Sequence, residues 1–369
     1  MGKGRRSAGF AAFAGSLLMV GALVAPAAQA STTTPVSVAT FNVCKGGPDG
    51  TSAACAAPAP SWTIRRDRVA NTISAASPDV LALQEITNNP TPNGAATMKA
   101  DVEDLLAGIG YQVTDSSAAD QCVRPRDAKG KLAGPNPCTN TTELAFNAAT
   151  THQATSTPNG TPTAGNALTS TVVAAGLPGG TVGPESASRN IAWSFLNARG
   201  RDVLAVSVHT TNSQTAAAEA DRVAIGQAIG PWTGRLLSEA GYPADTPVII
   251  AGDLNSFDNR NPEGIQQVLR DNGWIDAASA PDRIGARFYT VSHAKNLDDG
   301  NGFPTKPLMG RKTKNNPDGE GTRIDYIFTS PGTEVESYEV FVRTTADGHV
   351  DPAFQASDHN MVLATMHLG

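Results

Sequence analysis

Short apolar runs recur along the chain, and most have the length and composition of β-strands. Several are rich in Val and Ile, and some alternate apolar and polar positions, as a half-buried strand does. The run at 203–209, VLAVSVH, is apolar at nearly every position, so we expect neighbours to cover both of its faces. The predicted strands are 36–42, 80–84, 143–146, 171–174, 191–196, 203–209, 248–252, 323–328, 338–343 and 361–367.

Helical spacing lies between these runs. Val69 and Ile73 share one face of a predicted helix, and Asn212 or Ser213 is a suitable N-cap for another. The predicted helices are 65–76, 102–106, 213–229 and 262–271. Three stretches rich in Gly, Pro, Thr, Asn and Ala are predicted to be loops, at 115–139, 150–184 and 295–321.

Strands and helices are interleaved from end to end, which favours a layered α/β architecture over a helical bundle or a barrel. No internal repeat is visible, and no loop has the character of a linker between two cores. We therefore predict one domain within residues 31–369, with its first strand beginning near residue 35.

Residues 1–30 have the three-part layout of a secretory signal peptide. A basic start at Lys3, Arg5 and Arg6 precedes an apolar run at 10–24, and AQA at 28–30 is a small-x-small cleavage site. A membrane anchor is the alternative, but the run is shorter than the roughly 20 apolar residues that a spanning helix needs. We therefore expect a secreted protein that is cleaved before Ser31, has no stable membrane anchor and is a monomer.

Composition and charge narrow the classes further. Hydrophobic residues make up 40% of the chain, which excludes wholesale disorder. From Ser31 onward, 25 Lys and Arg face 34 Asp and Glu, a formal charge of −9. A protein of this charge is not a general polyanion binder, so a phosphate-ester substrate would need a local site or a bound cation.

The four cysteines suggest two disulfides, Cys44–Cys55 and Cys122–Cys138, because an exported protein meets an oxidising compartment. A zinc site is the alternative reading. The spacings lack the C-x₂-C knuckle that is typical of zinc sites, so we favour the disulfides.

Polar side chains that could take part in catalysis or metal binding follow, interrupt or precede the apolar runs. Polar groups at such places are either hydrogen-bonded within the fold or gathered at the rim of a pocket. They occur in six short motifs: Asn42 in VATFN, Glu85 in LALQEI, His209 in VSVH, Asp253 and Asn255 in IIAGDLNS, Asp325 in RIDYIF, and Asp358 and His359 in SDHNMV.

The residue types suit metal-assisted attack on phosphorus. Glu85, Asp253 and Asp358 are hard oxygen ligands of the kind that Mg²⁺ or Mn²⁺ prefers, and Asn42 adds an amide oxygen. Taken singly, each motif is more often a turn, a cap or a structural residue. The functional reading rests on their joint occurrence in one order.

Proton transfer has its own candidates. His209 and His359 are suited to moving a proton or stabilising a phosphate, and Asp325 could fix the tautomer of one imidazole.

The order of these motifs resembles that of the endonuclease/exonuclease/phosphatase superfamily, the DNase I-like fold, over nearly the whole chain from Val36 to Leu368. GDLN, RIDYIF and SDH together carry most of the specificity. The resemblance implies a four-layer sandwich, in which two mixed β-sheets pack face to face with helices outside, and an active site at one edge of it.

The resemblance also implies metal-binding positions. Glu85 matches the principal metal-binding glutamate, Asn42 the asparagine near metal and phosphate, and Asp358 a carboxylate at a second or alternative metal position. The implied cofactor is Mg²⁺, with Mn²⁺ as a substitute.

Catalytic roles follow from the same resemblance. Asp253 matches the aspartate that orients the attacking water or protonates the leaving group, and Asn255 the residue that holds a phosphate oxygen. His359 matches the histidine at the scissile phosphate, and Asp325 its paired aspartate. His209 looks like the histidine that acts as general acid in DNase-type and sphingomyelinase-type members.

Two basic features remain open. Arg189 stands where family members often have a phosphate-binding arginine, and a solvated strand-start charge is the alternative. The loop at 286–321 carries six cations and four acids, so it could either grip a phosphate backbone or be an ordinary solvated loop.

The implied function is an exported, Mg²⁺-dependent phosphodiesterase, best described as a nuclease acting on DNA or RNA. A sphingomyelinase-like phospholipid phosphodiesterase and a phosphomonoesterase are the alternatives within this class. A non-catalytic binding module is disfavoured because every expected polar position is present.

Overall fold

Two β-sheets form the centre of the structure. The computed structural model describes residues 34–45, 61–87, 97–114, 141–187, 189–258, 263–291 and 306–369, all within one unit, Thr33–Gly369. The predicted signal peptide lies outside these residues, as do the predicted loop at 115–139 and three of the four cysteines. The signal peptide and both disulfide pairings therefore stay predictions.

The first sheet is built mainly from the two ends of the chain. Its strands are β1 (Val36–Asn42), β2 (Val80–Ile86), β3 (Tyr111–Val113), β4 (Thr141–Asn147), β11 (Asp282–Ile284), β13 (Glu334–Phe341) and β14 (Met361–His367). Their order is β11-β13-β14-β1-β2-β4-β3. The pairs β1–β2 and β11–β13 are parallel and the others antiparallel, so the sheet is mixed.

The second sheet comes from the middle of the chain. Its strands are β5 (Thr151–Gln153), β6 (Ala164–Leu168), β7 (Asn190–Ala198), β8 (Arg201–His209), β9 (Val248–Asp253), β10 (Ile275–Asp276) and β12 (Asp325–Thr329). Their order is β10-β12-β9-β8-β7-β5, and β6 also pairs with β7. Only β8 and β9 run parallel among these pairs of described strands.

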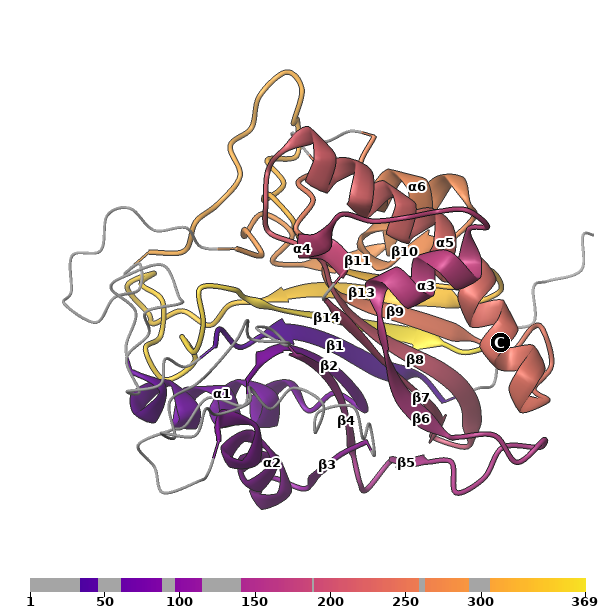
Figure 1. Ribbon diagram of the computed structural model, residues 1–369. Helices are drawn as coiled ribbons and strands as arrows, with labels where there is room; N and C mark the ends of the chain where they lie inside the picture. The colour runs from indigo at the N-terminus through magenta and orange to yellow at the C-terminus, as the bar shows by residue number, and fades with distance from the viewer. Residues whose placement is uncertain are drawn as a thin grey trace, which may run out of the picture. The chain divides into compact units, whose positions relative to one another are not determined.

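Helices cover the outer face of each sheet (Figure 1). Helices α1 (Trp62–Ala76) and α2 (Met98–Gly108) pack on the first sheet. Helices α3 (Thr169–Gly176), α5 (Ala216–Ala240) and α6 (Ile265–Asp271) pack on the second, with the short α4 (Pro184–Ala187) beside them. The predicted four-layer α/β sandwich is confirmed. Among the described residues, no helix is both long and apolar enough to cross a bilayer.

Strand alternation places the core. Val36 and Val38 of β1 face the second sheet, whereas Ala39 and Phe41 of the same strand face α1 and α2. Strand β8 is buried from Val203 to His209, as its continuous apolar run predicts. Apolar contacts between the sheets and under each helical layer therefore hold four layers together.

One predicted strand is wrong. Residues 171–174 belong to helix α3, although Thr171, Val172 and Val173 favour strands. Val172 and Val173 are buried against α5, and Gly176 approaches α5 so closely that a Cβ there would collide with the Ala228 carbonyl oxygen. Tertiary packing overrides the local preference. The predicted loop at 150–184 is also wrong, since β5, β6 and α3 lie inside it.

The ends of helix α5 also differ from the predicted ones. Helix α5 starts later than predicted, with Thr215 rather than Asn212 or Ser213 as its N-cap, and it continues to Ala240. The Thr215 side chain accepts a hydrogen bond from the Ala218 amide, which satisfies one orphan donor of the first turn.

The pairing directions create one functional edge. Parallel strands β1 and β2 end at the same edge of the first sheet, and β8 and β9 end at the same edge of the second. Strands β12 and β14 run antiparallel to β9 and β1, so they begin where those strands end. The polar motifs at these strand ends are therefore gathered by topology.

Candidate active site

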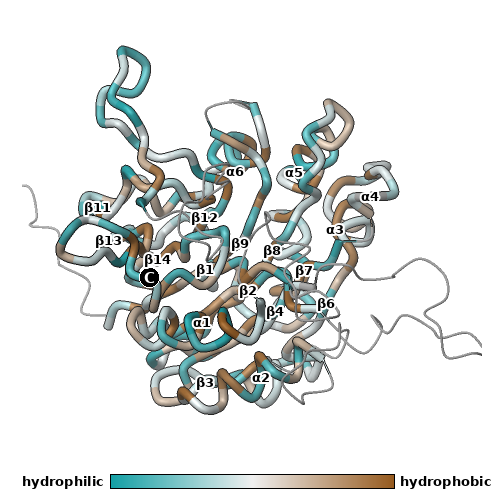
Figure 2. Tube along the Cα trace, turned by 90° about the vertical axis from the view of Figure 1, so that its left-hand side faces the viewer, coloured by the Kyte–Doolittle hydropathy of each residue, from teal (hydrophilic) through white to brown (hydrophobic). Residues whose placement is uncertain are grey.

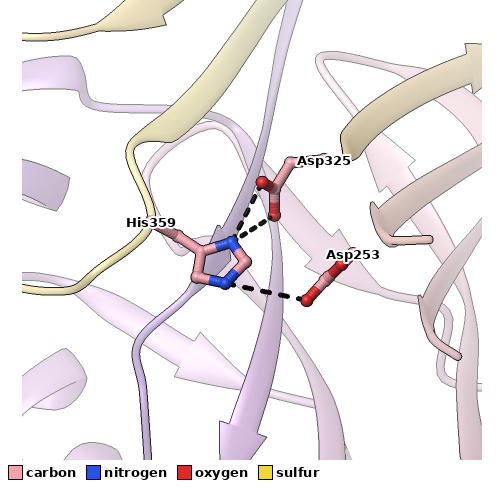
Figure 3. Close-up of side chains that lie close together, drawn as sticks. All are labelled: Asp253, Asp325 and His359. Carbon is pink, nitrogen blue, oxygen red and sulfur yellow. Dashed lines mark hydrogen bonds and ion pairs between the residues drawn. The ribbon is translucent and has the colours of Figure 1, made fainter. Parts of the chain in front are cut away.

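A buried histidine lies between two buried aspartates. Asp253 ends β9 and Asp325 begins β12, directly opposite it in register. The Nδ1 of His359 lies 3.0 and 3.1 Å from the two carboxylate oxygens of Asp325. Its Nε2 lies 3.8 Å from Oδ2 of Asp253 (Figure 3). The Asp325 carboxylate thus fixes the orientation of the ring and turns the other nitrogen toward Asp253.

The environments of His359 and Asp253 both favour the protonated form. Burial by itself would keep His359 neutral, but the charge and hydrogen bond of Asp325 outweigh it and hold the His359 pKa well above its ordinary value. Burial raises the pKa of Asp253 to about 7, with His359 opposing and Asp325 adding to the shift. Perturbed groups of this kind gather at functional sites.

Asn42 joins the two sheets at the site. Its Nδ2 donates to Oδ2 of Asp253 at 3.0 Å and to Oε1 of Glu85 at 3.3 Å. Its Oδ1 accepts from the Cys44 amide at 3.0 Å, which fixes the orientation of the side chain. A carboxylate from each sheet is therefore tied to the same amide.

Glu85 occupies an irregularity in β2. Its φ of 65° is left-handed, and the pairing of β2 with β4 shifts register at this residue. Its Oε2 accepts from the Lys45 amide at 2.9 Å. A non-glycine residue in this conformation costs energy and is typical of functional sites. The bulge turns the carboxylate toward Asn42 instead of leaving it in the ladder.

The oxygen donors fit a hard divalent cation. Among the described residues, no Lys or Arg side chain forms an ion pair with Glu85 or Asp358, and both side chains are only half-buried. Carboxylate and amide oxygens are the ligands that Mg²⁺ and Mn²⁺ take. The Glu85 carboxylate is therefore a suitable ligand, and Asn42 would add its Oδ1, which has a second lone pair besides the one that accepts from the Cys44 amide. Asp253, Asp325 and His359 form a second close group that could hold an ion.

His209 and Arg189 complete the second-sheet side of the site. Nδ1 of His209 lies 3.4 Å from Nη1 of Arg189, and its Nε2 lies 3.5 Å from Oδ2 of Asp253. Because the guanidinium can only donate, His209 accepts at Nδ1 and carries its proton on Nε2. Burial and then Arg189 hold the His209 pKa well below its ordinary value, so the ring is neutral.

Asn255 supports Asp253 from the following turn. Its backbone amide donates to Oδ1 of Asp253 at 2.9 Å, and its Nδ2 donates to the Thr210 carbonyl at 3.2 Å. Its φ of 48° is again left-handed, a conformation that Asn tolerates better than most residues. Asn255 therefore lies at the site through its backbone as well as its side chain.

Asp358 is placed differently from the other predicted residues. Its Oδ1 accepts from the Ser357 hydroxyl at 3.3 Å. Within the described part of the chain, no hydrogen bond or ion pair joins it to another predicted site residue. The structure thus connects Asn42, Glu85, Arg189, His209, Asp253, Asn255, Asp325 and His359 by direct contacts and leaves Asp358 beside them.

Sequence reasoning missed a buried arginine under the site. Arg65 is fully buried and donates to the carbonyls of Val43, Cys44 and Ala356 at 2.6 to 3.2 Å. It clamps the segment after Asn42 to the segment before Asp358. Burial lowers its pKa to about 10, with Asp358 and Glu85 opposing the shift. The signal was its position four residues before Val69, on the apolar face of α1.

Two hydroxyls also support the site. The Thr290 hydroxyl accepts from the amides of Ile324 and Asp325, and the Ser357 hydroxyl donates to the Asn42 carbonyl at 2.6 Å. Neither has a sequence signal, because each acts on a backbone group far away in the chain.

Comparisons agree with this architecture. The profile of the Endonuclease/Exonuclease/phosphatase family matches residues 39–359. No match was found among curated protein sequences. An endonuclease/exonuclease/phosphatase structure from Bacteroides vulgatus is 20% identical and covers 91% of this chain and 100% of its own, with a TM-score of 0.58.

Two further solved structures are similar. A mannosyl-6-phosphatase from Bacteroides thetaiotaomicron is 16% identical and covers 90% of this chain and 99% of its own, with a TM-score of 0.53. A protein described as an endonuclease/exonuclease/phosphatase from Beutenbergia cavernae is 18% identical, covering 91% and 72%, with a TM-score of 0.52. At these identities the likeness shows the fold alone.

Proposed function

Because the chain belongs to the endonuclease/exonuclease/phosphatase family, we propose that it is an exported, Mg²⁺-dependent phosphodiesterase that hydrolyses nucleic acid. A hydrolase of phosphate esters is what the family match itself shows. The observation that carries the finer proposal is the chain of contacts from Glu85 through Asn42 to Asp253. It ties an oxygen-donor set for a cation directly to a proton-transfer group.

The residues divide the chemistry among them. Asp253 accepts a proton from water as the water oxygen bonds to phosphorus, a task that suits a carboxyl with a pKa of about 7. The bond from phosphorus to the leaving oxygen breaks, and the leaving oxygen takes its proton from solvent water. His359, held as a cation by Asp325, stabilises the negative charge that builds up on the phosphate. Glu85 and Asn42 would hold Mg²⁺, which when bound polarises a phosphoryl oxygen as a Lewis acid.

His209 takes a donor role in this proposal. A neutral imidazole with its proton on Nε2 can donate a hydrogen bond to a phosphate oxygen. Its low pKa favours that role over the general-acid role that the family resemblance implies. Arg189, next to it, would supply a second positive contact to the phosphate.

Export is proposed from the sequence of residues 1–30. The basic start, the apolar run and the AQA site support a cleaved signal peptide. The proposed Cys44–Cys55 disulfide belongs to the same proposal, because such a bond forms and persists in an oxidising compartment. Expression of the full chain in a secreting host, followed by N-terminal sequencing, tests both the export and the cleavage position. We expect a mature protein that begins at Ser31, and an intact N-terminus in the cell would contradict export.

The catalytic proposal is tested with the chain from Ser31 and supercoiled plasmid. We expect nicking with Mg²⁺ or Mn²⁺, none with EDTA, and recovery when the metal is returned. Calorimetric titration with Mn²⁺ provides a readout other than activity. We expect the Glu85→Gln variant to have lost Mn²⁺ binding. Activity that survives EDTA would contradict metal dependence.

A phosphomonoesterase is the second candidate, because the similar Bacteroides thetaiotaomicron structure is described as a mannosyl-6-phosphatase. A phospholipid phosphodiesterase is the third. Sugar phosphates and sphingomyelin assayed beside the plasmid separate these cases. Faster hydrolysis of either would replace the nuclease proposal while leaving the phosphoesterase intact.

A further inference from the structure

A basic arm projects from the edge that carries the candidate active site. We define the arm as residues 306–321, which follow the described segment 286–291. The arm carries Lys306, Arg311, Lys312 and Lys314, and residues 306–317 contain no acid. All four cations are exposed, as is Arg287 at the arm's base. In Figure 1 the arm is the orange coil that rises above the sheets, and Figure 2 shows it as mainly hydrophilic.

The arm is anchored to the catalytic residues through its base. The Thr290 hydroxyl accepts from the Asp325 amide, and Val291 forms an isolated bridge with His359. Asn360, next to His359, donates its side-chain amide to the Tyr289 carbonyl at 2.7 Å. Arg287 is three residues from Thr290, so it starts within roughly 10 Å of chain length from this anchor.

Backbone pairing holds the arm in place. Segment 286–291 lies between two parts of the arm: the Tyr289 amide donates to the Leu308 carbonyl and the Gly321 amide to the Ala286 carbonyl. A Cβ on Gly310 would collide with the Glu320 carbonyl oxygen, so the backbone segments at Gly310 and Glu320 approach each other closely. A bridge between Thr313 and Asn316 closes the outer end as a hairpin. The cations are therefore presented on a formed scaffold.

Two of these cations lie close together, and none of the described ion pairs joins the arm's cations to its own acids, Asp318 and Glu320. Lys312 and Arg287 both lie against Gly319, where a Cβ would meet Lys312 Cγ at 3.0 Å and Arg287 Nε at 3.4 Å. Among the described residues, Arg287, Lys306, Arg311, Lys312 and Lys314 form no ion pair with an acid. By contrast, the neighbouring Arg270, Arg283 and Arg323 each pair with a carboxylate.

This contrast indicates a binding surface. The chain from Ser31 has a formal charge of −9, and three described arginines near the arm are neutralised by carboxylates. The like charges of Arg287 and Lys312, which lie close together, repel each other unless an anionic partner binds beside them. Several unpaired cations spread along one hairpin match a ligand with repeated charges better than a single phosphate, which would need converging donors.

We propose that the basic arm binds the phosphodiester backbone of a nucleic-acid substrate beyond the scissile phosphate. The proposal rests on the proposed nuclease function and adds a binding surface to it. A nucleic-acid strand carries one charge per roughly 3.4 Å and can cover the whole row of cations. A lipid surface fits less well, because Met309 is the one large apolar side chain exposed among the described arm residues.

Binding is tested apart from hydrolysis. The His359→Ala chain from Ser31, with Mg²⁺, is titrated with a fluorescein-labelled DNA duplex at several KCl concentrations. Lys312→Gln/Lys314→Gln in this background should weaken binding by about tenfold and reduce the slope of log K against log salt by about two. Arg311→Gln alone should reduce the slope by about one. The control, Arg201→Gln/Arg235→Gln, removes two exposed cations elsewhere and should change neither value.

Hydrolysis separates this proposal from the proposed function. With His359 restored, the double arm variant should hydrolyse bis(4-nitrophenyl) phosphate at the wild-type rate but cleave DNA with a lower kcat/KM. A wild-type protein that cleaves neither substrate would refute the nuclease function and not the binding surface. Active protein whose DNA affinity and salt slope are unchanged by the arm substitutions would overturn the arm proposal. Arm variants that no longer bind anionic phosphatidylserine vesicles but still bind DNA normally would overturn the arm proposal in favour of a membrane-binding surface.

Discussion

Asp253 and Asp325 lie directly opposite each other across strands β9 and β12, with one imidazole contacting both. Two buried carboxylates this close repel each other unless a cation lies between them. His359 supplies that cation, and Asp325 holds it in place. Burial raises the pKa of Asp253 to about 7, so this carboxyl can gain or lose a proton near neutral pH while His359 partly opposes the shift.

His359→Ala should remove the cation and the contact to the phosphate. We expect kcat on a small phosphodiester to fall by about 10²- to 10³-fold, while circular dichroism stays unchanged. The matched control is His367→Ala, at the other end of β14, where the imidazole pairs with Glu336 instead. Full activity in His359→Ala would contradict the proposed role of His359 at the phosphate. An equal loss of kcat in His367→Ala would also contradict it.

Glu85 stores backbone strain that glycine would release. Both Glu85→Gly and Glu85→Ala delete the carboxylate and should abolish metal binding and activity. At a φ of 65°, glycine is unstrained and alanine is not, so the Gly variant should be more stable than the Ala variant by about 1 kcal/mol. Urea unfolding without metal measures this difference. An Ala variant as stable as the Gly variant would mean that the bulge carries no strain.

Arg65→Met should loosen the clamp under the metal half of the site. Three carbonyl groups lose their donor, which should cost about 3 kcal/mol of unfolding free energy at roughly 1 kcal/mol per hydrogen bond. We also expect weaker Mn²⁺ binding, because the segments of Asn42 and Asp358 are no longer tied together. Arg68→Met is the control on the same helix; its guanidinium donates to the Gln355 carbonyl and to none of the three carbonyls that Arg65 holds, so both values should change little.

A loss of stability without any change in Mn²⁺ affinity would show that Arg65 serves the fold alone. Arg65→Lys distinguishes charge from geometry, because an ammonium keeps the charge but cannot reach the three carbonyls as a planar guanidinium does.

The buried carboxylate of Asp79, away from the catalytic edge, predicts that the stability of the protein depends on pH. Burial opposes the charge of Asp79, but hydrogen bonds from Arg199 and Ser37 outweigh it and lower its pKa. A lowered folded-state pKa adds stability above the ordinary Asp value, and that stability is lost as pH falls through the folded-state pKa. Arg199→Ala should therefore destabilise the protein more near pH 6 than near about pH 3.

Chemical unfolding at the two pH values checks this prediction. Arg201→Ala, two residues along, has an exposed side chain with no ion pair among the described residues and serves as the control. An equal loss of stability at both pH values in Arg199→Ala would show that the ion pair with Asp79 does not set the acid sensitivity.

Local pattern was a good guide to the strands that carry the site. The predicted strands at 36–42 and 361–367 match β1 and β14 residue for residue, and the polar motifs at 85, 209, 253 and 325 lie at one edge. Such strands are apolar enough to be recognised because they are buried on both faces. The failures fall where tertiary packing overrides the local preference, as in α3, whose valines favour a strand but form a helix that packs against α5.

By itself, the sequence determined the order of the polar motifs and the strands that end or begin beside them. Only the tertiary structure decided that Asn42 bonds both Glu85 and Asp253, that Arg65 lies beneath them, and which histidine is charged. Contacts and pKa values depend on burial and on neighbours hundreds of residues away, and a local pattern contains neither. The four-layer fold turns distant strand ends into one site because its parallel and antiparallel pairs meet at a single edge.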